Sequence, residues 1–206
     1  MRKVEFWYEF ASTYSYPAAM RVENIAKIFD ATISWQPFLL GPIFKQLGWT
    51  TSPFNLQAAK GSYMWRDLER TCMLNGLPPL TRPDPFPQNS LLAARVALAL
   101  PDDGPRAEFS RSVFTAEFAD GRSIDDKAVL ADILEKLDMP SAEWFERAAE
   151  PDIKDQLKAQ VARAQELGIF GAPMIVTSDE ELFWGNDRLE DGLRWETDHC
   201  ESRFPA

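Results

Sequence analysis

Residues 10–19, FASTYSYPAA, join a strand-like segment to a helix-like segment and contain two serines three positions apart, Ser12 and Ser15. Downstream, residues 15–29 have the content of a helix. Upstream, side chains alternate with the period of a β-strand: Val4, Phe6, Tyr8 and Phe10, with Glu5, Trp7 and Glu9 between them. The stretch therefore predicts a strand, a short loop and a helix, with hydroxyl groups where the helix begins.

Both serines are candidates for the N-cap of this helix, because serine hydroxyls accept hydrogen bonds from the unpaired amides of a first turn. If Ser12 were the cap, Pro17 would lack an amide proton that the helix already needs. If Ser15 is the cap, Pro17 falls within the first turn, where proline is tolerated. We therefore predict Ser15 as the cap and Ser12 in the preceding loop, with a cap at Ser12 as the alternative. The positive potential of a helix N-terminus beside Ser12 would favour a bound anion or thiolate.

The rest of the chain predicts a split α/β arrangement. Residues 31–38 form a second predicted strand that ends at Gly41 and Pro42, so the first three elements make a βαβ unit with parallel strands. Five helical patterns separated by proline-rich breaks follow: residues 55–72, 90–100, 107–118, 125–137 and 151–167. Two short strands and a helix close the chain: residues 174–177, 181–184 and 186–196. We therefore expect one discontinuous α/β domain around an all-helical insertion: residues 1–41 and 168–206, and residues 42–167.

The composition of this 206-residue chain argues against several classes of protein. A net charge of −10 disfavours nucleic acid and acidic membranes as partners, since those contacts need clustered Lys and Arg. No apolar run is long enough to span a membrane and no signal peptide is visible, so we expect a cytoplasmic protein. Cys72 and Cys200 form no C-x-x-C motif, and we expect two reduced thiols. His199 is the only histidine, which argues against Ser–His catalysis and against a metal site.

Two motifs in the last 40 or so residues each have an ordinary and a functional interpretation. In 168-GIFGAPM-174, the ordinary interpretation is a glycine–proline turn. The functional one is a cis Ala172–Pro173 bond that presents the backbone of Ala172 to an extended peptide. In 183-FWGNDRL-189, Asn186 or Asp187 is typical of a helix cap, but the pair also offers an amide and a carboxylate to the ends of an amino acid. Taken singly, these motifs leave both interpretations open.

Lys60, in 58-AAKGSYMWR-66, is either a solvated helix residue or a cation for a ligand carboxylate, and nothing local separates the two. The aromatic side chains near these motifs have a similar ambiguity. They belong to the core by default, but some would suit the wall of an aromatic substrate pocket: Trp7, Tyr8, Tyr14, Tyr16, Phe183 and Trp184.

The order βαβ, helical insertion, ββα resembles the thioredoxin-like fold in its DsbA form, with Ser12 to Ser15 where the redox members carry C-x-x-C. More closely, the chain is similar to the 2-hydroxychromene-2-carboxylate isomerases and the related kappa-class glutathione transferases. The resemblance runs over nearly the whole chain. Its motifs are YEFASTYSYPA, AAKGSYMWRDL, GIFGAPM and FWGNDRL.

The resemblance implies a role for each matching residue. Ser12 matches the catalytic serine that donates a hydrogen bond to the sulfur of glutathione. Ala172 and Pro173 match the cis-proline turn that pairs with the cysteinyl unit. Asn186 and Asp187 match the pair that holds the γ-glutamyl end. Lys60 matches a residue near the glycyl carboxylate. The sequence departs from the family at Thr13, usually proline, and at Pro17, usually leucine, and both positions adjoin the start of the helix.

The function implied is a glutathione-dependent isomerase of aromatic compound catabolism. Such an enzyme interconverts 2-hydroxychromene-2-carboxylate and trans-o-hydroxybenzylidenepyruvate by reversible thiolate addition, rotation and elimination. The partner is a small aromatic carboxylate, for which Arg66 or Arg95 would supply a cation, and a homodimer is possible. One alternative is a kappa-like transferase that conjugates glutathione to an electrophile. Another is a non-catalytic module that binds thiols or peptides.

Overall fold

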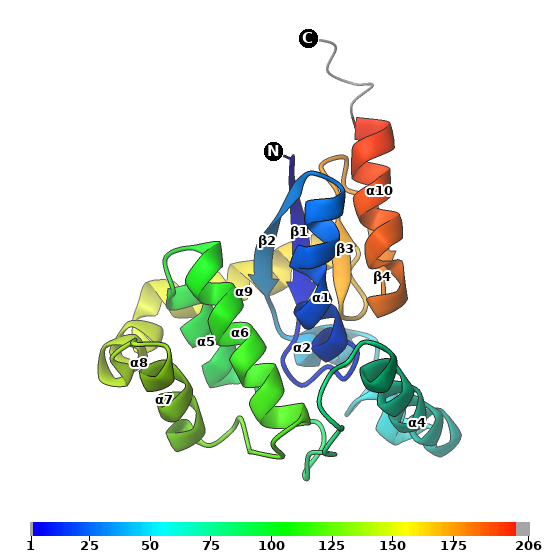
Figure 1. Ribbon diagram of the computed structural model, residues 1–206. Helices are drawn as coiled ribbons and strands as arrows, with labels where there is room; N and C mark the ends of the chain where they lie inside the picture. Colours follow the sequence, from blue (N-terminus) through cyan, green and yellow to red (C-terminus); the bar gives the residue numbers. More distant parts are fainter. Residues whose placement is uncertain (1, 201–206) are drawn as a thin grey trace.

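The computed structural model describes residues 2–200, and the side chain of Cys200 lies outside that description. Its centre is a four-stranded mixed sheet with the order β2-β1-β3-β4 (Figure 1). β1 pairs in parallel with β2 and antiparallel with β3, and β3 pairs antiparallel with β4. The strands are β1 (Arg2–Tyr8), β2 (Ala31–Pro37), β3 (Met174–Val176) and β4 (Leu182–Trp184).

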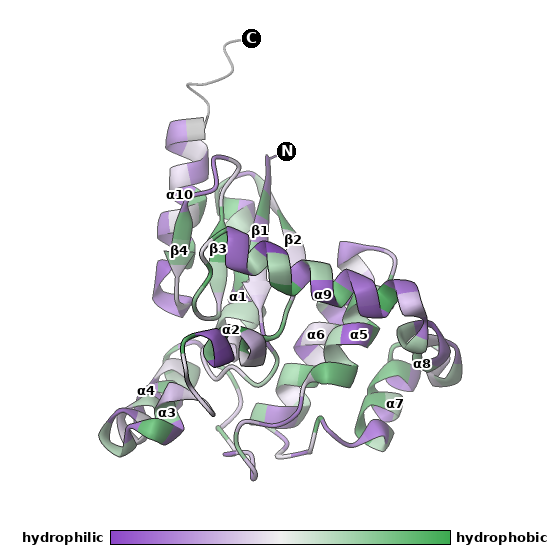
Figure 2. Ribbon diagram, turned by 180° about the vertical axis from the view of Figure 1, so that it is seen from behind, coloured by the Kyte–Doolittle hydropathy of each residue, from purple (hydrophilic) through white to green (hydrophobic). Residues whose placement is uncertain are grey.

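Helices cover both faces of the sheet. α1 and α10 lie on one face, where α6 also packs against α1 and β2 (Figure 1). The opposite face carries Trp7 and Met174, which pack with residues of α2 and α9. Figure 2, the view from behind, shows α9 lying across this face. The helices are α1 (Ser15–Ile28), α2 (Leu40–Gln46), α3 (Pro53–Leu56), α4 (Ala58–Leu74), α5 (Leu91–Ala99), α6 (Asp103–Phe118), α7 (Lys127–Lys136), α8 (Ser141–Ala149), α9 (Pro151–Glu166) and α10 (Leu189–Cys200), with the 3₁₀ turn η1 (Asn186–Arg188).

The predicted order of elements is confirmed, with local corrections. β1 ends at Tyr8 rather than at Phe10, because residues 9–14 turn away from the sheet into a loop. The helix predicted over residues 55–72 is two helices, since Gln57 between α3 and α4 has an extended backbone (φ −126°, ψ 93°). Two helices, α2 and α8, were not predicted. Both are short, and Pro42 and Pro140 lie at their starts, where the sequence suggests a break instead.

The helices between β2 and β3 share a core with the sheet. Tyr8 of β1 contacts Phe114 of α6 with ring centroids 6.0 Å apart. Tyr16 of α1 stacks on Phe118, which is also in α6, with ring centroids 5.6 Å apart. The division into a discontinuous domain and an insertion stays a prediction.

Among residues 2–200, no helix combines the length and the apolar character needed to cross a bilayer.

Gly61 allows α3 and α4 to pack closely. A Cβ at this position would lie 2.3 Å from the backbone oxygen of Phe54 in α3. We expect Gly61→Ala to displace α3 and to lower the free energy of unfolding by about 1–3 kcal/mol, as overpacking does. Urea unfolding measures this change. The control is Gly104→Ala in α6, where a Cβ meets nothing within 4 Å and helix propensity predicts a gain of up to about 1 kcal/mol. Equal stability of the Gly61 variant and the wild type would contradict this packing.

Candidate active site

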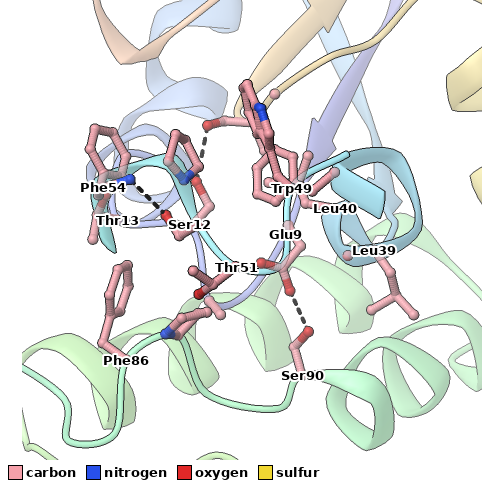
Figure 3. A pocket seen from close by; sticks show the side chains of 18 of the residues that line it. Glu9, Ser12, Thr13, Leu39, Leu40, Trp49, Thr51, Phe54, Phe86 and Ser90 are labelled. Carbon is pink, nitrogen blue, oxygen red and sulfur yellow. Dashed lines mark hydrogen bonds between the residues drawn. The ribbon is translucent and has the colours of Figure 1, made fainter. Parts of the chain in front are cut away.

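A cavity of about 560 Å³ lies beyond the carboxyl ends of β1 and β2 (Figure 3). Ligands of open α/β sheets bind at such strand ends. Ser12, Lys60 and Ala172, which are distant in sequence, all line this cavity. The lining residues are 9, 11–14, 39–42, 44, 49–54, 60, 86–91, 170–172 and 184.

Ser12 lies in the loop between β1 and α1, as predicted. Its amide donates to the carbonyl of Glu9, and its carbonyl accepts from the amide of Ser15, both at 3.0 Å. Its Oγ donates to the carbonyl oxygen of Ala172 at 3.0 Å, across 160 positions of sequence. The hydroxyl therefore connects the loop before α1 to the turn before β3 at the wall of the cavity.

The prediction that Ser15 caps α1 is wrong. Tyr14 occupies the cap position without a capping side chain, and the helix begins at Ser15. The turn closed by the carbonyl of Ser12 already gives Tyr14 a helical backbone (φ −78°, ψ −15°), so Ser15 falls inside the first turn. Its Oγ is buried and has no hydrogen-bond partner among the described residues. Pro17 lies in the first turn, as predicted.

The Ala172–Pro173 peptide bond is cis, as the resemblance implies. Ala172 is half-buried at the cavity wall, and Pro173 is buried behind it. The carbonyl of Pro173 accepts from the amide of Gly185 at 3.0 Å, which holds the turn against the end of β4. The backbone of Ala172 is thus fixed beside Ser12.

Lys60 lies in the first turn of α4 and is exposed at the cavity. It is the only cationic side chain among the described lining residues. The two arginines expected to bind a substrate carboxylate do not line the cavity. Arg66 is six positions beyond Lys60, on another side of the same helix, and forms an ion pair with Glu69 at 3.0 Å. Arg95 lies one turn of α5 beyond Leu91, the last lining residue of that segment.

Asn186 and Asp187 are on η1, which does not line the cavity, and neither side chain caps it. The Oδ1 of Asn186 accepts from Arg21 at 3.0 Å. Asp187 is exposed and close to Tyr14, a lining residue. Burial raises the pKa of Tyr14, the hydrogen bond to Asp67 raises it further, and the charge of Asp187 adds to this. Asp187 comes three positions after Trp184 of the cavity wall, while the amide oxygen of Asn186 is already engaged by Arg21.

Aromatic rings form much of the remaining wall. Phe170 and Trp184 contact each other with centroids 5.0 Å apart and are 48% and 51% exposed, so both rings lie at the entrance. Figure 3 shows Phe54 and Phe86 on one side of the cavity and Trp49 on the other. Of the aromatic residues selected from the sequence, Tyr14 and Trp184 line the cavity, whereas the rest belong to the core or pack against it: Trp7, Tyr8, Tyr16 and Phe183.

Sequence reasoning missed Glu9 and Ser90 as site residues. Glu9 has the same alternation as exposed polar strand residues, yet it follows the end of β1, lines the cavity and is only 7% exposed. The hydroxyl of Ser90 donates to its Oε1. Burial raises the pKa of Glu9 to about 7, although the bonds from Ser90 and from the amide of Ala11 lower it. Its position directly after Tyr8, the last paired residue of β1, is what separates it from Glu5.

A second carboxyl group lies behind Glu9. Glu117 of α6 is fully buried, and neither of its oxygens has a hydrogen-bond partner among the described residues. Burial, and to a lesser degree the charge of Glu9, raise its pKa well above the ordinary value.

Cys72 is a buried thiol, as predicted, and burial raises its pKa to about 11. A thiol in this state is no nucleophile at neutral pH.

Residues 3–193 match the family model described as a DSBA-like thioredoxin domain. The chain belongs to this DSBA-like family. The predicted thioredoxin-like fold of the DsbA type is therefore confirmed, although no cysteine occupies the start of α1 in this member.

Relatives of this DSBA-like protein include named enzymes. A 2-hydroxychromene-2-carboxylate isomerase of Pseudomonas putida is 27% identical over 190 residues, which cover 90% of each chain. Glutathione S-transferase kappa 1 of Homo sapiens is 27% identical over 203 residues, covering 92% of this chain and 88% of that one. A solved structure of a 2-hydroxychromene-2-carboxylate isomerase superposes with a TM-score of 0.86 at 24% identity, covering 98% of this chain and 97% of the other. The resemblance stated from the motifs agrees with these relatives.

Proposed function

We propose that this protein is a glutathione-dependent isomerase that interconverts 2-hydroxychromene-2-carboxylate and trans-o-hydroxybenzylidenepyruvate. The observation that carries the proposal is the hydrogen bond from Ser12 to the carbonyl of Ala172 at the wall of an aromatic cavity. It brings a hydroxyl donor and a backbone acceptor at the cavity wall together just before the N-terminus of α1. Relatives named as this isomerase and as a glutathione transferase support the choice of reaction and of thiol.

The donor set of the site fits a tripeptide thiol. The backbone of Ala172, beside the buried ring of Pro173, would pair with the cysteinyl unit. Asp187 would accept from the γ-glutamyl ammonium, with the amide group of Asn186 near its carboxylate. Lys60 would pair with the glycyl carboxylate at the rim. When bound, glutathione supplies a thiolate that adds reversibly to the conjugated double bond of the substrate and lets that bond rotate.

The hydroxyl of Ser12 has one proton, so it donates one hydrogen bond at a time. In the structure this proton is donated to the carbonyl of Ala172. Turning the hydroxyl toward a sulfur stabilises the thiolate form and at the same time releases the carbonyl to accept from a peptide amide. The positive end of α1 adds to the same effect, because anions are stabilised at helix N-termini. Ser12 thus polarises a sulfur without being a nucleophile.

The aromatic wall would hold the ring of the substrate and exclude water. Rings of Phe54, Phe86 and Trp49 offer flat apolar surface to an aromatic ligand (Figure 3). The substrate also carries a carboxylate, but Lys60, the one cation among the described lining residues, is assigned to the glycyl carboxylate. A homodimer and a cytoplasmic location stay predictions.

The experiment is an incubation of the protein with 2-hydroxychromene-2-carboxylate, with and without glutathione. We expect the trans product to form only with glutathione, and the amount of free glutathione to stay constant. A second incubation contains glutathione and a chlorinated aromatic compound. Accumulation of a stable thioether there, with loss of free glutathione, would favour a kappa-like transferase instead. A thermal-shift titration with glutathione measures binding separately, since a ligand of the folded state raises the melting temperature.

Asp187→Asn tests the amino-acid end of the site. Removing the carboxylate weakens a charge-assisted hydrogen bond, and we expect the KM for glutathione to rise about 10-fold or more with kcat little changed. Steady-state kinetics at varied glutathione measures both constants. Asp191→Asn is the control, because this exposed carboxylate pairs with Arg188 at 2.7 Å and is not part of the proposed site. An unchanged KM in the Asp187 variant would remove this residue from the site.

A further inference from the structure

Glu9 is a carboxyl group inside the cavity for which thiol binding has no use. It is the only carboxylate-bearing side chain among the described lining residues. Figure 3 shows its side chain between Ser12 and Ser90, with the Ser90 hydroxyl bonded to it. Only 7% of it is exposed, so the part that solvent reaches faces the cavity.

The surroundings of Glu9 keep its proton available at neutral pH. Burial raises its pKa to about 7, against the lowering effect of Ser90 and the Ala11 amide. Glu117 of α6 is the titratable group on the core side, and burial raises its pKa well above the ordinary value, with a smaller contribution from the charge of Glu9. Within the cavity, Tyr14 has a raised pKa and Lys60 is out at the rim. A carboxyl group whose pKa is near the working pH suits general acid–base catalysis, which requires both protonation states to be accessible.

The ring of the proposed substrate must open before any thiol can act. 2-Hydroxychromene-2-carboxylate is a cyclic hemiketal, and its double bond is conjugated with a ketone only after the ring opens. Opening breaks the bond between the ring oxygen and the hemiketal carbon. The hydroxyl on that carbon loses its proton and becomes the ketone oxygen, while the ring oxygen gains a proton and becomes a phenol. The hydroxyl oxygen thus loses a proton and the ring oxygen gains one, and both oxygens start out bonded to the same carbon.

We propose that Glu9 is the acid–base residue that opens this ring, in a step that needs no glutathione. The neutral carboxyl group donates its proton to the ring oxygen as the carbon–oxygen bond breaks. Its other oxygen accepts the proton of the hemiketal hydroxyl as the C=O bond forms, so Glu9 is neutral again at the end. The bond from Ser90 positions the carboxyl group for both transfers. This inference rests on the substrate of the proposed function, but not on its thiol chemistry.

The test uses the full-length protein without glutathione. Two-dimensional ¹H NMR exchange spectroscopy measures the rate at which ring-closed and ring-opened substrate interconvert at equilibrium. We expect the wild type to accelerate the exchange about 100-fold over buffer, within the range of general acid–base catalysis. Glu9→Gln should return it to the buffer rate. Glu5→Gln is the matched control, because Glu5 lies four residues before Glu9, within β1, and pairs with Arg163 at 2.8 Å outside the cavity.

A second variant keeps the proposal testable if Glu9→Gln fails to fold. Ser90→Ala removes a bond that lowers the pKa of Glu9, so the pH profile of the exchange rate should keep its inflection and shift it upward from about 7. Exchange at the buffer rate in the wild type, or a wild-type rate in folded Glu9→Gln, would overturn the role of Glu9. Trans-product formation with added glutathione is assayed in parallel. Its absence, with ring opening retained, would overturn the isomerase proposal alone.

Discussion

Ser12→Ala is expected to slow isomerisation about 100-fold or more while the fold is retained. The variant lacks the hydroxyl donor to the sulfur, and the loss of one such preorganised donor costs a factor of about 10² to 10³ in other enzymes. The pKa of bound glutathione should rise with it, because the thiolate loses a hydrogen bond. Thiolate absorbance followed against pH measures that shift, and the rate of trans-product formation measures the effect on turnover.

Ser15→Ala is the matched control for this experiment. Ser15 is three positions away on the same segment, but its hydroxyl is buried without a hydrogen-bond partner among the described residues. Its removal should leave turnover and the thiol pKa unchanged and should not destabilise the fold. Normal turnover in Ser12→Ala would instead favour a thiol- or peptide-binding module without catalysis. In that case the hydrogen bond to Ala172 would have a structural role only.

The second large effect concerns stability against pH. Glu9 and Glu117 are buried carboxyl groups whose pKa values are raised on folding, that of Glu9 to about 7. A raised pKa of the folded state gives stability that is complete below the unfolded pKa of about 4.5 and is lost as pH rises through the folded value. For Glu9 the loss is roughly 3 kcal/mol between pH 4.5 and pH 8. We therefore expect the protein to become less stable from pH 5 to pH 9.

Glu117→Gln should reduce that loss. The variant removes one of the two buried acids, so at pH 9 its free energy of unfolding should exceed that of the wild type, with a much smaller difference at pH 5. Urea unfolding at pH 5, 7 and 9 measures this. Glu108→Gln is the control, since Glu108 is exposed on the same helix. A parallel pH dependence in wild type and Glu117→Gln would mean that the Glu117 carboxyl is not buried as described.

Features that depend on near neighbours in the chain could be predicted from the sequence. The alternation in residues 4–8, the position of Pro17 and the spacing of the glycine–proline turn are all local, and they predicted β1, the loop position of Ser12 and the order of elements. Local rules failed where two registers differ by one residue, as at Ser15. They also failed for short helices such as α8, where the proline at the start suggests a break in the chain.

The contents of the site were decided by packing between distant segments. Glu5 and Glu9 share one strand pattern, but only Glu9 meets Ser90, 81 positions away, and is buried. Arg66 and Lys60 share one helix, but only Lys60 faces the cavity. The sequence by itself determined that a hydroxyl precedes α1 and that a proline turn precedes β3. Tertiary structure alone decided that the two meet and which carboxyl group lies beside them, because burial and hydrogen bonding at that point depend on residues far away in the chain.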